Sequence, residues 1–307
     1  MKVSTTYLFD RAVDQMAQGQ TRLAKSQAQL ASSKQVISPS DAPDQAATIE
    51  RFKSMFGRQD SYETSLNMVN NRLQAEESSL TGVSNLLLRM KELTIQAAND
   101  TMNLEDKKVL AVEMKGLRDQ ALNLANTQDS SGSYIFGGSR VKLPPFVTDA
   151  NGDTVYQGDQ TQMRVAVGDQ RTVLLNRSGT ETFTSVVRTN EKGEASGIGF
   201  FQVIDDVIDG MRNGVPSKVI AGIDELDQLQ NALSLSLAEV GTDQNVLQSQ
   251  KTVLEETRLS LKSVLSDIED LDYSKAITEM NKHMLSLEEA QSSFAKISQL
   301  SLFNFIN

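Results

Sequence analysis

The sequence predicts a mainly α-helical protein with a long antiparallel helical rod, a terminal coiled coil formed by its N- and C-terminal segments, and a small inserted β domain. Three observations support this prediction. Apolar residues recur at helical spacing near both ends of the 307-residue chain, and broader helical stripes follow them inward. Only a central stretch, near residues 130–189, changes to short alternating runs separated by turn signals.

The N-terminal segment carries a narrow apolar stripe at strict heptad spacing, formed by Phe9, Met16, Leu23, Leu30 and Ile37. Such a repeat keeps one side of a helix apolar and favours a partner helix. The positions three residues after stripe members are small, namely Ala12, Gly19, Ser26 and Ser33. We therefore expect a helix over residues 9–37 that is too weakly apolar to be stable alone.

The C-terminal segment supplies the expected partner. Its apolar residues recur at steps of three and four, and are Ile277, Met280, Met284, Leu287, Phe294 and Ile297. Residues 1–40 hold five basic and two acidic side chains (net +3), whereas residues 261–307 hold four basic and seven acidic ones (net −3). Because opposite charges favour association, we predict that the termini pair as antiparallel helices. Both stripes are the candidate assembly interface, within and between subunits.

Between the termini, the pattern predicts two rod helices. Residues 38–45 contain two prolines and predict a joint between helices, with Ser40 or Asp41 as the N-cap of the next helix. Within residues 46–98, one heptad line is formed by Leu66, Leu73, Leu80 and Leu87. Glu76 is the only misfit of the broader stripe, and it lies on the adjoining line with Tyr62, Val69, Val83 and Met90. Asn103 is the expected cap of a further helix that ends near Asn126.

The remainder of the chain predicts the insert and the returning helices. Gly, Thr and Val dominate the insert, and Asn151-Gly152 is one of its turn signals. Helical patterns return at 200–211 and 217–240 and again from about 244, with an acidic joint at 267–273. The predicted domains are a terminal coiled coil (1–45 and 260–307), a helical rod (46–135 and 184–259) and a β domain (136–183).

Composition excludes several classes of function. The net charge of −10 argues against a nucleic-acid partner, and no apolar run is long enough for membrane insertion. The chain has no cysteine, so disulfides and thiolate chemistry are excluded. No ordinary secretory signal is visible. These features fit a cytosolic protein, and equally one that is threaded out of the cell without oxidative folding.

No motif indicates catalysis, a cofactor or a metal. Asp149, Asn151 and Asp153 imitate the start of a calcium loop, but Thr154 and Gln160 stand where Gly and Glu are required. A hairpin turn explains this segment better. His283 is the only histidine, so we expect it to be a helix-surface residue rather than a ligand or a base. We predict a protein that is not an enzyme.

Four stretches together resemble the flagellin superfamily along essentially the whole chain. The joint resembles the one that follows the family's first helix, and its matching residues are Pro39, Asp41 and Pro43. The segment 134–138, with Phe136, Gly137 and Gly138, resembles the element after the second rod helix. Residues 156–159, with Arg164 and residues 176–183, resemble the family's β insert, and residues 301–306 resemble its C-terminal ending. The two prolines of the joint, in place of a Lys-Asp-Asp-rich version, favour the branch at the hook–filament junction.

The resemblance implies a structural adaptor rather than an enzyme. Such proteins are exported unfolded by the flagellar type III apparatus with a cytoplasmic chaperone, and fold their termini on assembly outside the cell. The implied partners are hook-associated protein 1 on the hook side, flagellin on the filament side, and further copies of the chain in a ring. The implied chaperone-binding residues are Met284, Leu287, Phe294 and Ile297.

Two other interpretations remain open on the sequence alone. A filament-forming flagellin shares the same terminal patterns, and it would polymerise alone into long filaments. A cytosolic coiled-coil scaffold would share the heptads but would be absent from shed axial structures. Neither alternative requires a cofactor.

Overall fold

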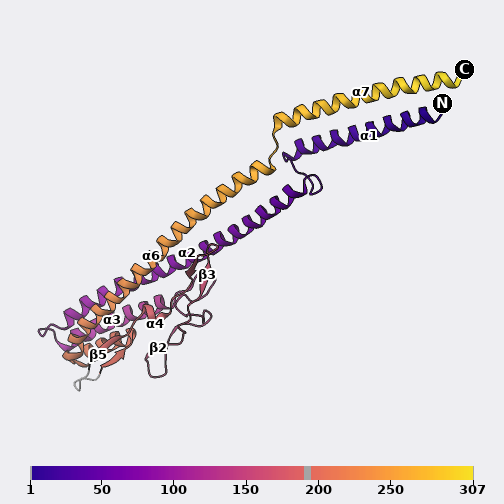
Figure 1. Ribbon diagram of the computed structural model, residues 1–307. Coiled ribbons are helices and arrows are strands. Elements are labelled where there is room, and N and C mark those ends of the chain that lie inside the picture. Colours follow the sequence, from indigo (N-terminus) through magenta and orange to yellow (C-terminus); the bar gives the residue numbers. More distant parts are fainter. Residues whose placement is uncertain (1, 190–194, 307) are drawn as a thin grey trace. The chain divides into compact units, whose positions relative to one another are not determined.

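The computed structural model describes residues 2–189 and 195–306, and this part of the chain forms seven α-helices and six short strands (Figure 1). It confirms the predicted fold class. The chain divides into two compact units, residues 1–58 with 256–307 and residues 59–255. The helices are α1 (Lys2–Ser32), α2 (Pro43–Ala97), α3 (Leu104–Ala125), α4 (Gly179–Thr182), α5 (Phe200–Asn213), α6 (Pro216–Glu269) and α7 (Tyr273–Ile306).

In the first unit, α1 and α7 lie side by side and antiparallel, so that the beginning of α1 lies beside the end of α7 (Figure 1). This arrangement confirms the terminal coiled coil. The predicted extent of the first helix was wrong, however, because α1 ends at Ser32. Ser33 has a φ of +59°, a left-handed conformation that stops a helix of L-residues. Ile37 therefore lies in the joint and not on the helical stripe.

The second unit is built on the predicted heptad lines. The leucines of α2 at 66, 73, 80 and 87 are buried, and so are Val69, Val83 and Met90 beside them. Asn103 caps α3 as predicted, since its side chain accepts a hydrogen bond from the backbone N–H of Asp106 (2.9 Å). The helix α6 passes through residues 240–244 without the interruption that the sequence suggested. Gly241, which is half-buried, is tolerated inside this long helix.

Three antiparallel strand pairs occupy the middle of this unit. They are β1 (Phe146–Thr148) with β2 (Thr154–Tyr156), β3 (Arg164–Ala166) with β4 (Thr172–Leu174), and β5 (Val186–Thr189) with β6 (Ala195–Ile198). An aromatic cluster attaches the first pair to α5, because the ring of Phe146 lies 5.3 Å from that of Phe183 and 5.4 Å from that of Phe201. Edge-to-face contacts of this kind add to the burial of the rings.

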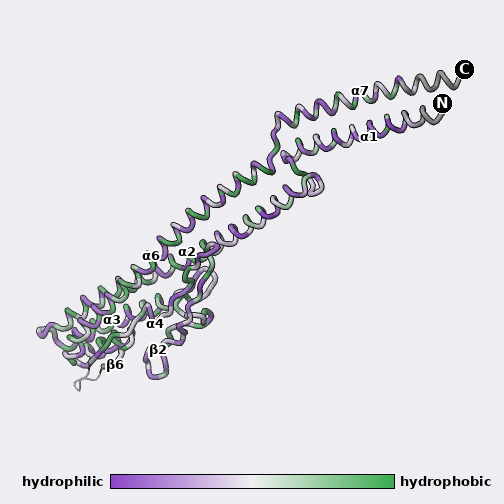
Figure 2. The backbone as a smooth tube through the Cα atoms, viewed as in Figure 1, coloured by the Kyte–Doolittle hydropathy of each residue, from purple (hydrophilic) through white to green (hydrophobic). Residues whose placement is uncertain are grey.

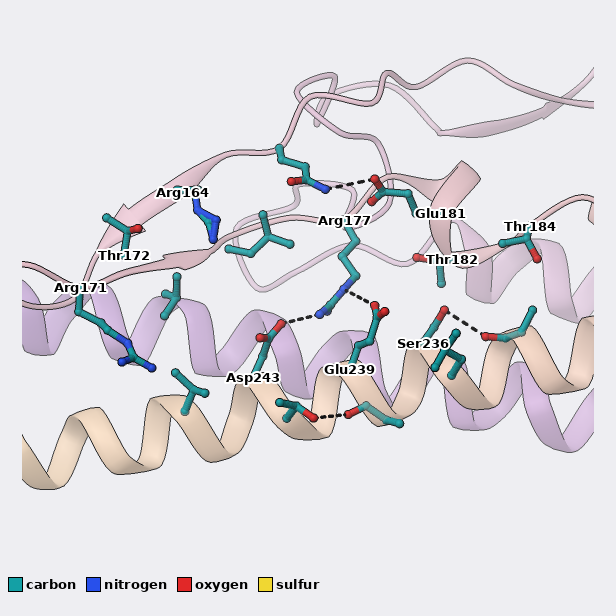
Figure 3. A pocket seen from close by; sticks show the side chains of 18 residues that line it. Arg164, Arg171, Thr172, Arg177, Glu181, Thr182, Thr184, Ser236, Glu239 and Asp243 are labelled. Atoms are coloured by element: carbon teal, nitrogen blue, oxygen red, sulfur yellow. Dashed lines mark hydrogen bonds and ion pairs between the residues drawn. The ribbon is translucent and has the colours of Figure 1, made fainter.

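The misfit of the α2 heptad, Glu76, is a buried ion-pair residue. It is only 4% exposed, and Arg177, which follows β4, donates to its Oε1 at 3.2 Å. Figure 3 shows the same guanidinium reaching Glu239 and Asp243 of α6. Burial raises the pKa of Glu76, and the positive charge of Arg177 opposes that shift. The pair thereby attaches the end of the β3–β4 hairpin to α2 and α6.

Replacing Arg177 with Met should lower the free energy of unfolding by about 3–5 kcal/mol at neutral pH, because it leaves the Glu76 carboxylate buried without a cation. The loss should shrink as the pH falls, since a carboxyl whose pKa is raised in the folded state becomes neutral there first. The double variant Glu76→Leu with Arg177→Met should recover most of the stability. Urea unfolding measures both, and a double variant as unstable as the single one would contradict the pairing.

Candidate assembly interface

The two predicted stripes meet along one line of contact, which we call the α1–α7 seam. Near its outer end the rings of Phe9 and Phe294 lie 4.7 Å apart. Further along, Leu287 lies against Gly19. A Cβ added to Gly19 would lie 3.3 Å from the Cδ1 of Leu287. Figure 2 shows hydrophobic and hydrophilic residues interspersed along the coloured parts of both helices.

The stripe residues differ in how far their side chains are buried. Half-buried side chains are Met16, Leu23, Leu30, Met280, Leu287 and Phe294. Ile277 and Met284 of α7 are 46% and 45% exposed, so α1 does not cover them. Ile37 is exposed in the joint. Ile297 and residues 301–306 lie outside the residues whose side chains the structure describes. The structure therefore brings together part of the predicted set and leaves another part facing outward.

The seam also uses residues that the sequence analysis treated as weak positions. Gly19 admits Leu287, and Ser26 is buried on the same helix. On α7, Ala276 is buried one turn from its start. A heptad line of small residues on one helix is the signal that could have identified these close contacts, since small side chains let a partner helix approach.

Asp41 organises the joint, although it does not cap α2 as predicted. Its Oδ1 accepts from Lys25 Nζ at 2.7 Å and its Oδ2 from the backbone N–H of Ser38 at 3.1 Å. The ammonium of Lys25 and that N–H hold the pKa of Asp41 below its ordinary value of 3.8. Pro43 is the first residue of α2, a position that needs no N–H donor, and Pro39 is exposed in the turn.

The second family motif is a tight turn of the other unit. Phe136 is fully buried, and its backbone oxygen accepts from the hydroxyl of Tyr156 at 2.9 Å. Gly138 has a φ of +67°, and a Cβ there would lie 2.2 Å from the backbone oxygen of Asp159. Only glycine fits that position. Gly137 is buried beside it and pairs with Ser178 in an isolated β-bridge.

The remaining candidates behave as structural elements. Asp149 closes the β1–β2 turn, with its Oδ1 accepting from the backbone N–H groups of Asn151 (2.8 Å) and Asp153 (2.9 Å). His283 is half-buried on α7 and borders a hollow beside Gly19. In the described residues, no group of three His, Cys, Asp or Glu side chains is placed to hold a metal ion. None of the described helices has the length and apolar character required to span a bilayer.

Models of known protein families match both helical ends of the chain. The model of the bacterial flagellin N-terminal helical region matches residues 3–140, and that of the C-terminal helical region matches residues 223–306. These matches contain α1, α2, α3, most of α6 and α7. The chain belongs to the flagellin superfamily.

Individual relatives refine this placement. Flagellar hook-associated protein 3 of Escherichia coli K12 is 27% identical over 316 aligned positions, which cover 99% of each chain. A flagellin of Listeria monocytogenes is 22% identical and covers 97% of this chain and 96% of its own length. The solved structure of a putative flagellar hook-associated protein from Vibrio parahaemolyticus has the same fold, with a TM-score of 0.67 and 21% identity over 75% of this chain and all of that one.

Replacing Asp41 with Asn should weaken the joint at neutral pH. Because the pKa of Asp41 is depressed in the folded state, its stabilisation is complete above pH 3.8 and is lost as the pH falls through the lower folded value. Hydrogen exchange of the Ser38 amide should therefore be faster in Asp41→Asn than in the unaltered chain at pH 6, and the two should converge once the pH has fallen below the lowered folded pKa of Asp41. Asp14→Asn serves as the control, and a difference that persists in acid would contradict this role.

Proposed function

We propose that this protein is a structural adaptor of the bacterial flagellum that joins the hook to the filament. The observation that carries the proposal is the end-to-end match with a relative named flagellar hook-associated protein 3, at 27% identity. The flagellin relative is less similar over nearly the same length. The family is one of structural flagellar proteins, so the chain acts through its surfaces.

The proposed partners are other axial proteins of the flagellum. We place hook-associated protein 1 on the hook side, flagellin on the filament side, and further copies of this chain beside it in a ring. Such contacts along an axis are heterologous, because each subunit presents one surface to the subunit before it and another to the next. Export by the flagellar type III apparatus and an extracellular position complete the proposal, and the absence of cysteine is compatible with both.

The α1–α7 seam supports a role of the termini in assembly. A two-stranded pair buries only one side of each helix, and Ile277, Met284 and Leu285 remain 45–57% exposed on α7. Val13 and Tyr7 of α1 are also exposed. Neighbouring subunits that cover these side chains would complete the burial that the pair leaves unfinished.

We further propose that α7 is the segment that the export chaperone binds before assembly. Met284, Leu287, Phe294 and Ile297 are the candidate residues. The exposure of Met284 and the acidic flanks of the helix, with Glu288 and Glu289 both exposed, support a partner that has an apolar groove with a basic rim.

Replacing Leu287 and Phe294 with Asp should abolish motility, because it places charges in the seam. Met284→Asp distinguishes the role of the stripe in pairing α1 with α7 from its role in assembly. We expect that variant to keep the pairing of α1 with α7 in the isolated chain, yet to fail in assembly. Swimming assays and electron microscopy of the cells measure the outcome, with bare hooks and flagellin in the medium as the expected phenotype.

The matched control adds the same charges to exposed positions of α7, as Ser292→Asp with Ser293→Asp, and should swim normally. Normal swimming of the Leu287 and Phe294 variant would contradict the role of the seam. Growth of long filaments from the purified chain alone would instead support a filament-forming flagellin.

A further inference from the structure

The sequence contains two Asn-Gly pairs, Asn151-Gly152 and Asn213-Gly214. In such a pair the backbone nitrogen of the glycine can attack the side-chain carbonyl carbon of the preceding asparagine, because glycine has no side chain that obstructs the approach. Both pairs are exposed to solvent in the second unit. Exposure therefore does not distinguish them, and the difference lies in how firmly the backbone of each pair is held.

The pair Asn213-Gly214 is held at the end of α5. Asn213 is the last residue of that helix, and the N–H of Gly214 donates to the carbonyl of Gly210. The N–H of Val215 donates to the same carbonyl at 2.9 Å. Only Gly214 and Val215 separate α5 from α6, and Met211 in the last turn of α5 is fully buried. Freeing the nitrogen of Gly214 therefore requires opening a packed helix end.

The pair Asn151-Gly152 lies at the exposed tip of the β1–β2 hairpin. The N–H of Gly152 donates to the carbonyl of Asp149 at 3.2 Å. The Nδ2 of Asn151 lies 3.3 Å from Asp149 Oδ2, just beyond the usual range of an N–H···O bond. Phe146 anchors the far end of the hairpin in the aromatic cluster, so the tip can open without disturbing that cluster.

The tip of this hairpin is weakly supported and uncrowded. Each of its strands has only three residues, and a two-stranded hairpin of that size has marginal stability of its own. Among the described residues, no atom beyond the chain neighbours of Gly152 lies within 4 Å of a Cβ built there. The atoms that would close a ring therefore have room to move.

We propose that Asn151-Gly152 is a site of spontaneous deamidation in the folded protein, that the turn bonds to Asp149 set its rate, and that Asn213-Gly214 is protected. The nitrogen of Gly152 forms a bond to Cγ of Asn151. The bond from Cγ to Nδ2 breaks, and ammonia leaves with the proton that the Gly152 nitrogen gives up. Water then opens the succinimide ring at one of its two carbonyls, which yields either aspartate or isoaspartate. Water is the only co-reactant.

Either product alters the β1–β2 turn. A new carboxylate at position 151 lies between those of Asp149 and Asp153, and like charges repel. Isoaspartate also lengthens the backbone by one carbon. The Oδ1 of Asp149, which accepts from the N–H of Asn151 at 2.8 Å and of Asp153 at 2.9 Å, then cannot keep both bonds. The modified turn should therefore be looser, with faster hydrogen exchange of the Asp153 amide.

Incubation of the purified chain in mildly alkaline buffer tests the proposal. Mass spectrometry of the two peptides measures deamidation, and methyltransferase labelling detects isoaspartate. Deamidation in the folded chain should be at least about tenfold faster at Asn151 than at Asn213, because an exposed turn opens more readily than a packed helix end. In urea the two rates should agree within about twofold, since neither structure persists. Equal rates in the folded chain, or a tenfold difference that persists in urea, would overturn the proposal.

A matched pair of variants tests the role of the turn. Asp149→Ala removes the acceptor of the turn bonds, so it should accelerate deamidation at Asn151 severalfold and leave Asn213 unchanged. Asp153→Ala removes an equal charge from the same turn, keeps the bonds to Asp149, and should leave both rates unchanged. An unchanged rate at Asn151 in Asp149→Ala, or equal acceleration by the two variants, would overturn the proposal. These measurements need no assembled flagellum, so their outcome is independent of the proposed function.

Discussion

Incomplete burial along the α1–α7 seam is the constraint on which the rest of the first unit depends. A helix gains most of its stability from packing an apolar side, and neither terminal helix has a side wide enough to be stable alone. Their pairing covers one line of contacts, in which Gly19 lets Leu287 approach closely. Met284 and Ile277 remain outside that line. The paired helices therefore leave apolar side chains of α7 exposed.

In the second unit, a β-rich insert packs against long helices. Buried arginines perform that task. Arg72 donates to the carbonyl of Ile135 at 3.0 Å, Arg177 reaches Glu76, and Arg118 forms two bonds of 3.0 Å to Asp205. The planar guanidinium can serve several acceptors at once, so one side chain can connect several elements. These interactions position the insert against the helices.

Patterns within one helix could be predicted from the sequence, whereas contacts between distant segments could not. The heptad of α2, the Asn103 cap and the acidic joint before Tyr273 depend on residues a few positions apart, and all three were found. The end of α1 depends on a bridge to residues 269–271, so periodicity carried the predicted helix too far, to Ile37. Glu76 likewise appeared as a misfit because its partner lies 101 residues away.

The antiparallel seam places the beginning of α1 beside the end of α7, with Phe9 against Phe294. Truncation at either terminus therefore shortens the same end of the helix pair. The helix that remains loses its packing partner there. A fluorescent label attached near Phe9 would therefore lie next to one attached near Phe294. Labels placed at these two positions therefore both report on the same end of the paired helices.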